Sequence, residues 1–202
     1  VAMALQTTTS CANQSFEVRV DQFKDNTNDL LQAITLRYLS PLFHMLFSKE
    51  ELASVNPSAK ADQPFDEVYG FIVHHHADDQ NAFSAWAHPG QSSDITVVHT
   101  DDSEVTVNIC LNPTGQQPFS GSNLKFIPSD DKQTDCLEVI QKPGRGVMHL
   151  GSVKHDVLPL NKGERWNLIL WCRRSKQENT TISKFENHEY LKQLESMGFP
   201  KD

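Results

Sequence analysis

The chain has 202 residues, of which 38% are hydrophobic and 22% are charged, as is usual for a folded globular protein. Its net charge of −8 argues against avid binding to a nucleic acid, which needs clustered lysine and arginine residues. No apolar run approaches the roughly 18 residues of a membrane span, and residues 1–10 lack the basic start and apolar core of a signal peptide. We therefore expect one domain over residues 1–202, with room for a sizeable core.

The cysteine pattern favours reduced thiols. The spacing of the four cysteines fits no zinc site, and two of them lie in apolar runs, where a thiol behaves as a small hydrophobic group. They are Cys11, Cys110, Cys136 and Cys172. This pattern favours the cytoplasm. The localisation nevertheless stays open, because the triplets that begin at Asn13 and Asn179 are glycosylation acceptors in a secreted protein.

The first part of the chain, about residues 1–65, has the features of one strand followed by helices. Residues 16–20 alternate between apolar and polar side chains and predict a strand. Apolar residues from 28 to 47 recur at helical spacing, with Pro41 as a break or a first-turn residue. Two prolines among small and polar residues predict a loop over 54–64.

From about residue 66 to 174 the pattern changes to short strands. Turn-forming residues separate the apolar runs, among them the triplet Asn161-Lys-Gly163. The expected strands are 68–73, 95–98, 105–111, 124–127, 137–140, 146–150 and 166–171. Many short strands with regular turns indicate a sandwich or a barrel. The tail, about 175–202, is expected to hold a last helix over 187–196.

A histidine and an aspartate, His99 and Asp101, follow one of these expected strands. Two residues separated by one point to the same face of an extended chain, so an imidazole and a carboxylate would converge. A third ligand from a distant strand would complete a facial triad, which suits non-haem iron(II) and leaves coordination positions open. The pair alone is weak evidence, because the same spacing recurs at His76 and Asp78. That second pair lies in a polar stretch with no strand after it, which indicates a solvated loop.

Two later histidines, His149 and His155, are candidates for the third ligand. Arg165 follows ten residues after His155, and a hairpin through 161–163 would bring it back alongside that histidine. An arginine in such a place can grip a carboxylate through two parallel hydrogen bonds.

Three motifs in this region occur in a fixed order. They are His99-Thr-Asp-Asp-Ser-Glu-Val-Thr-Val-Asn-Ile-Cys-Leu111, then Gly121-Ser-Asn-Leu-Lys-Phe126, then the segment from His149 to Trp171. Together they resemble the 2-oxoglutarate- and iron(II)-dependent oxygenases of the prolyl and lysyl hydroxylase type. The resemblance is to an uncharacterised branch that carries HxDxSExTxNxCL, GxxLxF and HxG…HxxxPxxxGxRxNLxLW, and it covers about residues 68–173.

The resemblance implies a fold, a metal site and a reaction. The fold is a mainly β double-stranded β-helix, or jelly roll, with the N-terminal helices packed on one sheet. Iron(II) is held by His99, Asp101 and His155, and 2-oxoglutarate is bound by Arg165. The family places that base ten residues after its second histidine, which selects His155 over His149. With O2 as cosubstrate, such enzymes hydroxylate a C–H bond and release succinate and CO2.

One position departs from the family pattern. The family often has a tyrosine that helps to bind 2-oxoglutarate at the end of the strand that corresponds to 71–73. That place falls on His74 or His75 in this chain, and Tyr69 is a fallback. The sequence leaves open which of these residues contacts the cosubstrate, and it also leaves open the role of His149.

The substrate is expected to be a side chain of a peptide or protein rather than a nucleic acid. Loops over 54–64 and 80–93, the second with Phe83 and Trp86, could fold over an extended peptide. A free amino acid or another small molecule is the alternative. Two rival classes are a cupin-like metal-binding jelly roll without oxygenase activity, which would not need Arg165, and a non-catalytic binding module, which would not need the complete set.

The sequence also predicts the environment of three polar residues close to the metal motif. Glu104 is expected to face solvent, and Ser103 is expected to shape a turn. Asn108 faces either the core or the site, because the turn before it interrupts the alternation of the strand.

Overall fold

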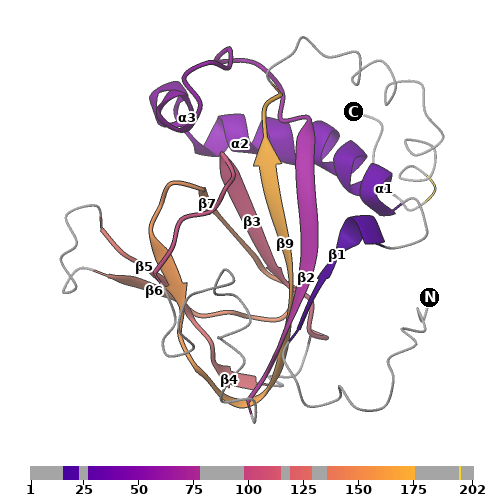
Figure 1. Cartoon of the computed structure of the whole chain (residues 1–202), viewed down its shortest axis with the longest axis vertical. Coiled ribbons are helices and arrows are strands. Elements are labelled where there is room, and N and C mark those ends of the chain that lie inside the picture. The colour runs from indigo at the N-terminus through magenta and orange to yellow at the C-terminus, as the bar shows by residue number, and fades with distance from the viewer. Residues whose placement is uncertain are drawn as a thin grey trace, which may run out of the picture.

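The structure, a computed structural model, describes residues 16–22, 27–77, 98–114, 119–128, 136–175 and 196 (Figure 1). Its N-terminal elements are β1 (Phe16–Arg19), a 3₁₀ turn (Val20–Gln22), α1 (Thr27–Ile34), a π-helical segment (Thr35–Leu39), α2 (Ser40–Leu46) and α3 (Lys49–Val55). The other strands are β2 (Glu67–His76), β3 (Val105–Cys110), β4 (Phe119–Gly121), β5 (Leu124–Phe126), β6 (Leu137–Val139), β7 (Gly146–Leu150), β8 (His155–Val157) and β9 (Leu160–Arg173).

The expected helical stretch from 28 to 47 is confirmed as α1, the π-helical segment and α2 in direct succession. Pro41 lies in the first turn of α2, directly after the π-helical segment, in which the N–H of Ser40 donates to the carbonyl of Thr35. Helix α3 is absent from the sequence prediction, although a capping box marks its start. The backbone N–H of Ser48 donates to Oε2 of Glu51 at 2.8 Å, and the N–H of Glu51 donates to Oγ of Ser48 at 3.2 Å.

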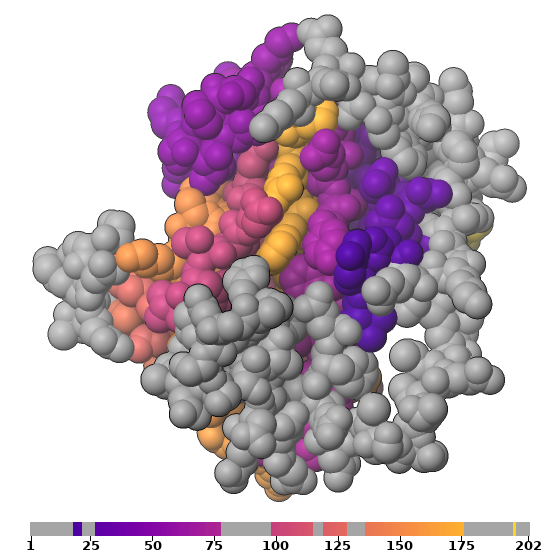
Figure 2. Space-filling view, in the orientation of Figure 1, coloured from indigo at the N-terminus to yellow at the C-terminus, as the bar shows by residue number. Residues whose placement is uncertain are grey.

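Antiparallel strands form two sheets, and the order of the strands identifies the jelly roll. The larger sheet has the order β1-β2-β9-β3-β7, with β4 paired to one end of β9, and the smaller sheet has the order β6-β5-β8. The space-filling view agrees, because β9 is visible as an orange stripe between β3 and β2 (Figure 2). The expected double-stranded β-helix with N-terminal helices is therefore confirmed.

The two faces of the larger sheet carry different kinds of side chain. One face packs on the helices in an apolar cluster: Val20, Leu31, Phe43, Leu52, Phe65, Val105, Val107, Leu170 and Cys172. Neighbours in register share a face, so the opposite face carries Thr106 with its partner His149, and His75 with its partner Arg165. These residues alternate with the apolar ones along each strand. The polar residues of the site therefore point away from the helices.

The expected turn over 161–163 is wrong, because these residues lie inside the long strand β9. Gly163 takes a φ of 80°, a left-handed conformation that favours glycine, so the strand continues without reversing there. The short strand β4 pairs with this end of β9, which occupies the edge that a hairpin would have used. His155 and Arg165 consequently belong to different sheets rather than to one hairpin.

Several expectations concern residues outside the described part of the chain. The strand over 95–98 and the helix over 187–196 are described only at their last residues. The loop over 80–93, with Phe83 and Trp86, is not described at all. Within the described ranges, no helix combines the length and the apolar character that crossing a membrane requires, and Cys110, Cys136 and Cys172 are free thiols.

Candidate metal centre

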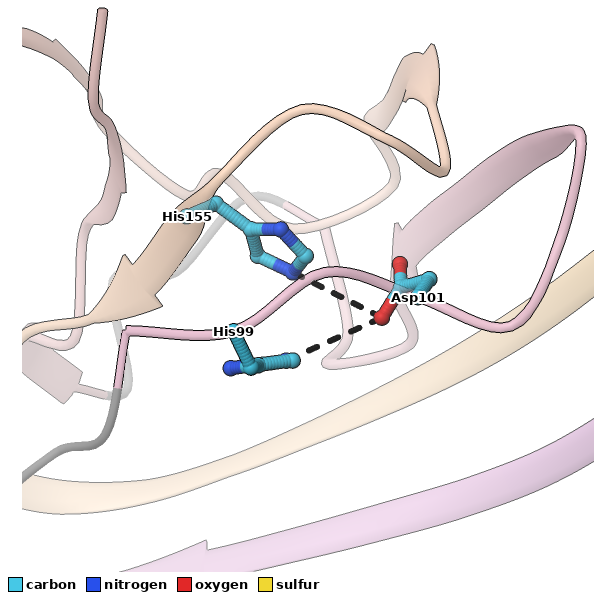
Figure 3. Close-up of side chains that lie close together, drawn as sticks. All are labelled: His99, Asp101 and His155. Atoms are coloured by element: carbon cyan, nitrogen blue, oxygen red, sulfur yellow. Dashed lines mark ion pairs between the residues drawn. The ribbon is translucent and has the colours of Figure 1, made fainter. Parts of the chain in front are cut away.

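His99 and Asp101 lie on the segment that leads into β3, and His155 is the first residue of β8 (Figure 3). The backbones of His99 and His155 form an isolated antiparallel bridge, in which each N–H donates to the other carbonyl at 2.9 Å. Asp101 is fixed separately, because its N–H donates to the carbonyl of Gly151 at 2.9 Å. Backbone contacts between two distant segments thus bring the three side chains together.

These three side chains point toward one another and could hold one metal ion (Figure 3). Nε2 of His99 lies 3.7 Å from Oδ1 of Asp101, and Nε2 of His155 lies 3.8 Å from the same oxygen. All three donor atoms lie within 4.8 Å of one another. The side chains of Asp101 and His155 are only 5% and 6% exposed, whereas His99 leaves 49% of its side chain exposed. The group expected from the sequence is therefore brought together, with one side facing solvent.

His155 has the protonation state that a metal ligand needs. Its Nδ1 donates to the carbonyl of Val153 at 3.0 Å, which leaves the lone pair of Nε2 on the side of Asp101. Burial lowers the pKa of His155 below its ordinary value, and the nearby carboxylate of Asp101 offsets part of this effect. A neutral imidazole in a fixed tautomer is the form that binds a metal.

His149 lies against the same carboxylate, on its other oxygen. Its Nε2 is 3.7 Å from Oδ2 of Asp101, and its Nδ1 donates to the carbonyl of Leu150 at 3.0 Å. Burial, reinforced by the nearby His155, lowers the pKa of His149 to about 4. Its ring centroid is 4.6 Å from that of His155 and 5.2 Å from that of Phe126. His149 is thus a neutral, packed neighbour of the three donors rather than one of them.

Arg165 is buried on the face of β9 that points away from the helices, with only 2% of its surface exposed. Its Nη1 donates to the carbonyl of Ser122 at 2.7 Å. Among the described residues, no acidic side chain pairs with Arg165, and its Nε has no hydrogen-bond partner. Burial lowers the pKa of the guanidinium only to about 10, so it stays charged at neutral pH. A buried cation without an anion is costly, and an anionic ligand would relieve that cost.

The three candidates for the other contact to a cosubstrate lie in different surroundings. His75 pairs in register with Arg165 and is buried, and desolvation and the charge of Arg165 lower its pKa to about 3. His74 points to the opposite face, where its ring stacks on Trp166 and its Nε2 lies 2.9 Å from Glu164. Tyr69 shares the face of Arg165 but packs against aromatic rings farther along β2. His75 is therefore the candidate beside Arg165.

Sequence reasoning missed two contacts and misplaced one side chain. Thr106 donates a hydrogen bond to Asp101, and Ser122, whose carbonyl accepts from Arg165, has a buried Oγ without a partner among the described residues. Glu104, expected to face solvent, is 4% exposed and pairs with Arg174. The spacing of Thr106, five residues after Asp101 on the following strand, was the available signal for the first contact.

The donor chemistry of the site fits a metal ion and an anionic cosubstrate. Two imidazole nitrogens and one carboxylate oxygen, with no fourth donor among the described residues, form the ligand pattern of mononuclear non-haem iron. The guanidinium of Arg165, which pairs with no acidic side chain in the described part of the chain, fits a carboxylate. A jelly roll with such a set belongs to the class of mononuclear metal-binding β-helix proteins, which includes both oxygenases and cupins.

Comparison with known proteins identifies the family within that class. Residues 71–174 match the family model of the 2OG-Fe(II) oxygenase superfamily, and the chain therefore belongs to that superfamily, whose cofactors are iron(II) and 2-oxoglutarate. A solved structure of a 2OG-Fe(II) oxygenase family oxidoreductase from Burkholderia pseudomallei shares the fold. It has a TM-score of 0.51 and 14% identity over 82% of this chain and 70% of the other.

Curated relatives carry the same domain in longer chains. The 2-oxoglutarate and iron-dependent oxygenase domain-containing protein ICU11 of Arabidopsis thaliana is 29% identical over 80% of this chain and 35% of its own length. The human 2-oxoglutarate and iron-dependent oxygenase domain-containing protein 2 is 36% identical over 51% of this chain and 29% of its own length. This chain thus spans about a third or less of these relatives.

Proposed function

We propose that this chain is an iron(II)- and 2-oxoglutarate-dependent dioxygenase that hydroxylates a C–H bond on a side chain of a peptide or protein. The overall reaction would consume the substrate together with 2-oxoglutarate and O2. It would give the hydroxylated product together with succinate and CO2, with one oxygen atom of O2 in each of the product and succinate. When bound, the metal and the cosubstrate supply the oxidising chemistry. The chain supplies binding, orientation and exclusion of water.

His99, Asp101 and His155 are assigned as the metal ligands. Their donor atoms face a common point, and the backbone bridge between His99 and His155 sets the distance between the two imidazoles. The hydrogen bond from Nδ1 of His155 to Val153 fixes which nitrogen faces the metal. With three protein ligands, positions remain for the cosubstrate and for O2.

The observation that carries the proposal is the buried guanidinium of Arg165, which pairs with no acidic side chain among the described residues. A metal-binding jelly roll of the cupin type would not need a buried cation here. Burial of a charge without a partner destabilises the fold, because the charge loses its hydration. 2-Oxoglutarate has one carboxylate and a keto oxygen to chelate the metal, and a second carboxylate to pair with an arginine. Ser122, whose carbonyl accepts from Nη1 of Arg165, has a buried Oγ without a partner among the described residues, and this hydroxyl is a candidate second donor to the same carboxylate.

Charge supports a peptide or protein substrate over a nucleic acid. The net charge of −8 provides no basic stripe that could follow a phosphate backbone. The motif resemblance to hydroxylases of peptidyl proline and lysine supports a peptide by analogy. A free amino acid or another small molecule is the second candidate, because the half-exposed His99 places one side of the metal site at the surface, where either kind of molecule could approach.

The test is succinate formation from 2-oxoglutarate with iron(II), in air and under anaerobic conditions. Peptide pools, mixed free amino acids and oligonucleotides are compared side by side, and we expect O2-dependent stimulation by peptides. Stimulation by oligonucleotides alone, lost at moderate salt, would contradict the substrate class. Absence of any O2-dependent succinate, in protein that binds both metal and 2-oxoglutarate, would favour the cupin-like class.

Metal content separates the ligand assignment from the activity. The His99→Ala and Asp101→Ala variants should lose the stoichiometric metal that the unaltered chain binds. The matched control is His76→Ala, because His76 begins the other His-x-Asp pair of the sequence. Full metal content in a His99→Ala, Asp101→Ala double variant would contradict the assignment and direct attention to His76 and Asp78.

A further inference from the structure

We infer that Thr106 is a positioning residue of the metal centre: its hydroxyl holds one oxygen of Asp101 and leaves the other oxygen for the metal. The inference rests on the proposed metal site of His99, Asp101 and His155. It assigns a function to a side chain that touches the ligand and not the metal.

The two oxygens of Asp101 face different groups. Oδ1 lies 3.7 Å from Nε2 of His99 and 3.8 Å from Nε2 of His155, on the side of the donor atoms. Oδ2 accepts a hydrogen bond from Oγ1 of Thr106 at 2.5 Å and faces His149 on its other flank at 3.7 Å. The carboxylate is thus divided between a metal side and a protein side.

A second hydroxyl sets the direction of this hydrogen bond. Oγ of Ser103 lies 2.8 Å from Oγ1 of Thr106. A hydroxyl has a single proton, and the carboxylate can only accept, so Thr106 donates to Asp101 and accepts from Ser103. Each bond in such a chain polarises the next one, and the resulting chain runs from Ser103 through Thr106 to Oδ2.

Thr106 is held rigidly enough to serve this function. It is 2% exposed on the inner strand β3, and its register partners are His149 on β7 and Trp171 on β9. A β-branched side chain between two paired strands has few rotamers available. The sheet therefore fixes the position of its hydroxyl, because the side chain itself has little rotational freedom.

Removal of the hydroxyl would leave a buried carboxylate oxygen without a donor. The side chain of Asp101 is only 5% exposed, so water would not readily replace the lost hydrogen bond. The carboxylate would then be free to rotate, and Oδ1 would no longer be held toward the imidazoles of His99 and His155. Contacts of this kind to metal ligands typically change metal affinity by about 10–100-fold.

The experiment titrates the full chain, stripped of metal, with Co(II) and records both the affinity and the d–d absorption, whose intensity reports the coordination number. Thr106→Val keeps the shape of the side chain and removes the donor, and Thr106→Ser keeps the donor. The matched control is Thr114→Val, at an exposed position away from the three ligands. Circular dichroism and cooperative thermal unfolding establish that each variant is folded.

We expect Thr106→Val to bind Co(II) about 10–100-fold more weakly and to give an altered absorption band at saturation. Thr106→Ser and Thr114→Val should match the unaltered chain in both respects. An unchanged affinity and band in Thr106→Val, or a Thr106→Ser variant as weak as Thr106→Val, would overturn the inference. Equal Co(II) binding by the unaltered chain and by His99→Ala would overturn the proposed metal site itself.

Discussion

The carboxylate of Glu104 accepts a 2.7 Å hydrogen bond from Nε of Arg174, and both side chains are buried. The pair joins the start of β3 to the end of β9, and the guanidinium also donates to the carbonyl of Leu52 in α3 at 2.8 Å. Nδ2 of Asn56 donates to the carboxylate at 2.6 Å. Glu104 thus ties the segment that leaves the metal centre to the helices behind the sheet.

Replacing Glu104 with alanine should destabilise the fold strongly. Removing one partner of a buried, hydrogen-bonded ion pair leaves the other charge uncompensated and costs about 3–5 kcal/mol. The free energy of unfolding from urea titration measures this loss. The matched control is Arg173→Ala, since Arg173 forms a 2.6 Å ion pair with the exposed Asp102 that should contribute about 1 kcal/mol or less. Equal losses in the two variants would contradict the assigned importance of the buried pair.

Glu104 also illustrates what the sequence could and could not predict. The alternating strands and the convergence of His99 with Asp101 followed from local patterns, and motif spacing singled out Arg165, whose burial only the structure shows. The burial of Glu104 did not, because its partner lies 70 residues away and a turn interrupts the alternation before β3. The turn predicted at Gly163 is wrong for a similar reason. The pairing that shows the strand to continue there is with β4, which lies about 40 residues earlier in the chain.

Arg165 should be required for 2-oxoglutarate binding and not for metal binding. Arg165→Lys keeps the charge but loses the planar pair of donors, so the affinity for 2-oxoglutarate should fall measurably, and Arg165→Ala should lower it further. Calorimetry with Mn(II)-loaded protein gives both affinities. Arg145→Ala, at an exposed position, is the control. Unchanged affinity for 2-oxoglutarate in Arg165→Ala would show that another base binds the distal carboxylate, with Lys125 or Lys154 as the next candidates.

Acid should destabilise the metal-free chain through His75. Desolvation and the neighbouring charge of Arg165 lower the pKa of His75 from 6.5 to about 3 in the folded state. Between these values the unfolded chain binds more protons, so the free energy of unfolding falls as the pH is lowered from about 6.5 toward 3. One such group contributes a slope of up to about 1.4 kcal/mol per pH unit.

Urea titrations of the metal-free chain at several pH values between 7.5 and 4.5 measure this slope. His75→Gln removes the titrating group and should give a shallower slope. Burial also lowers the pKa of His149 and of His155, so part of the dependence should remain in the variant. A slope identical to that of the unaltered chain would mean that His75 does not contribute.

Gly151 should be irreplaceable because it lies directly against the metal-binding segment. Its carbonyl accepts the N–H of Asp101 at 2.9 Å, and its own N–H donates to the carbonyl of Glu104 at 3.0 Å. A Cβ at this position would lie 2.0 Å from the carbonyl oxygen of Ser103. A Cβ is fixed to its own backbone and the oxygen of Ser103 belongs to the backbone, so no side-chain rotation can relieve this clash. The segment that carries Asp101 would have to move.

We therefore expect Gly151→Ala to weaken Co(II) binding and to lower the free energy of unfolding by about 1–3 kcal/mol, as for an overpacked interior site. Gly146→Ala is the matched control, at the first residue of β7, since a Cβ there would meet nothing closer than Ile109 Cγ1 at 3.5 Å. That variant should keep both metal binding and stability. If Gly151→Ala bound Co(II) as tightly as Gly146→Ala, the position of Asp101 would not depend on the close approach of these two backbones.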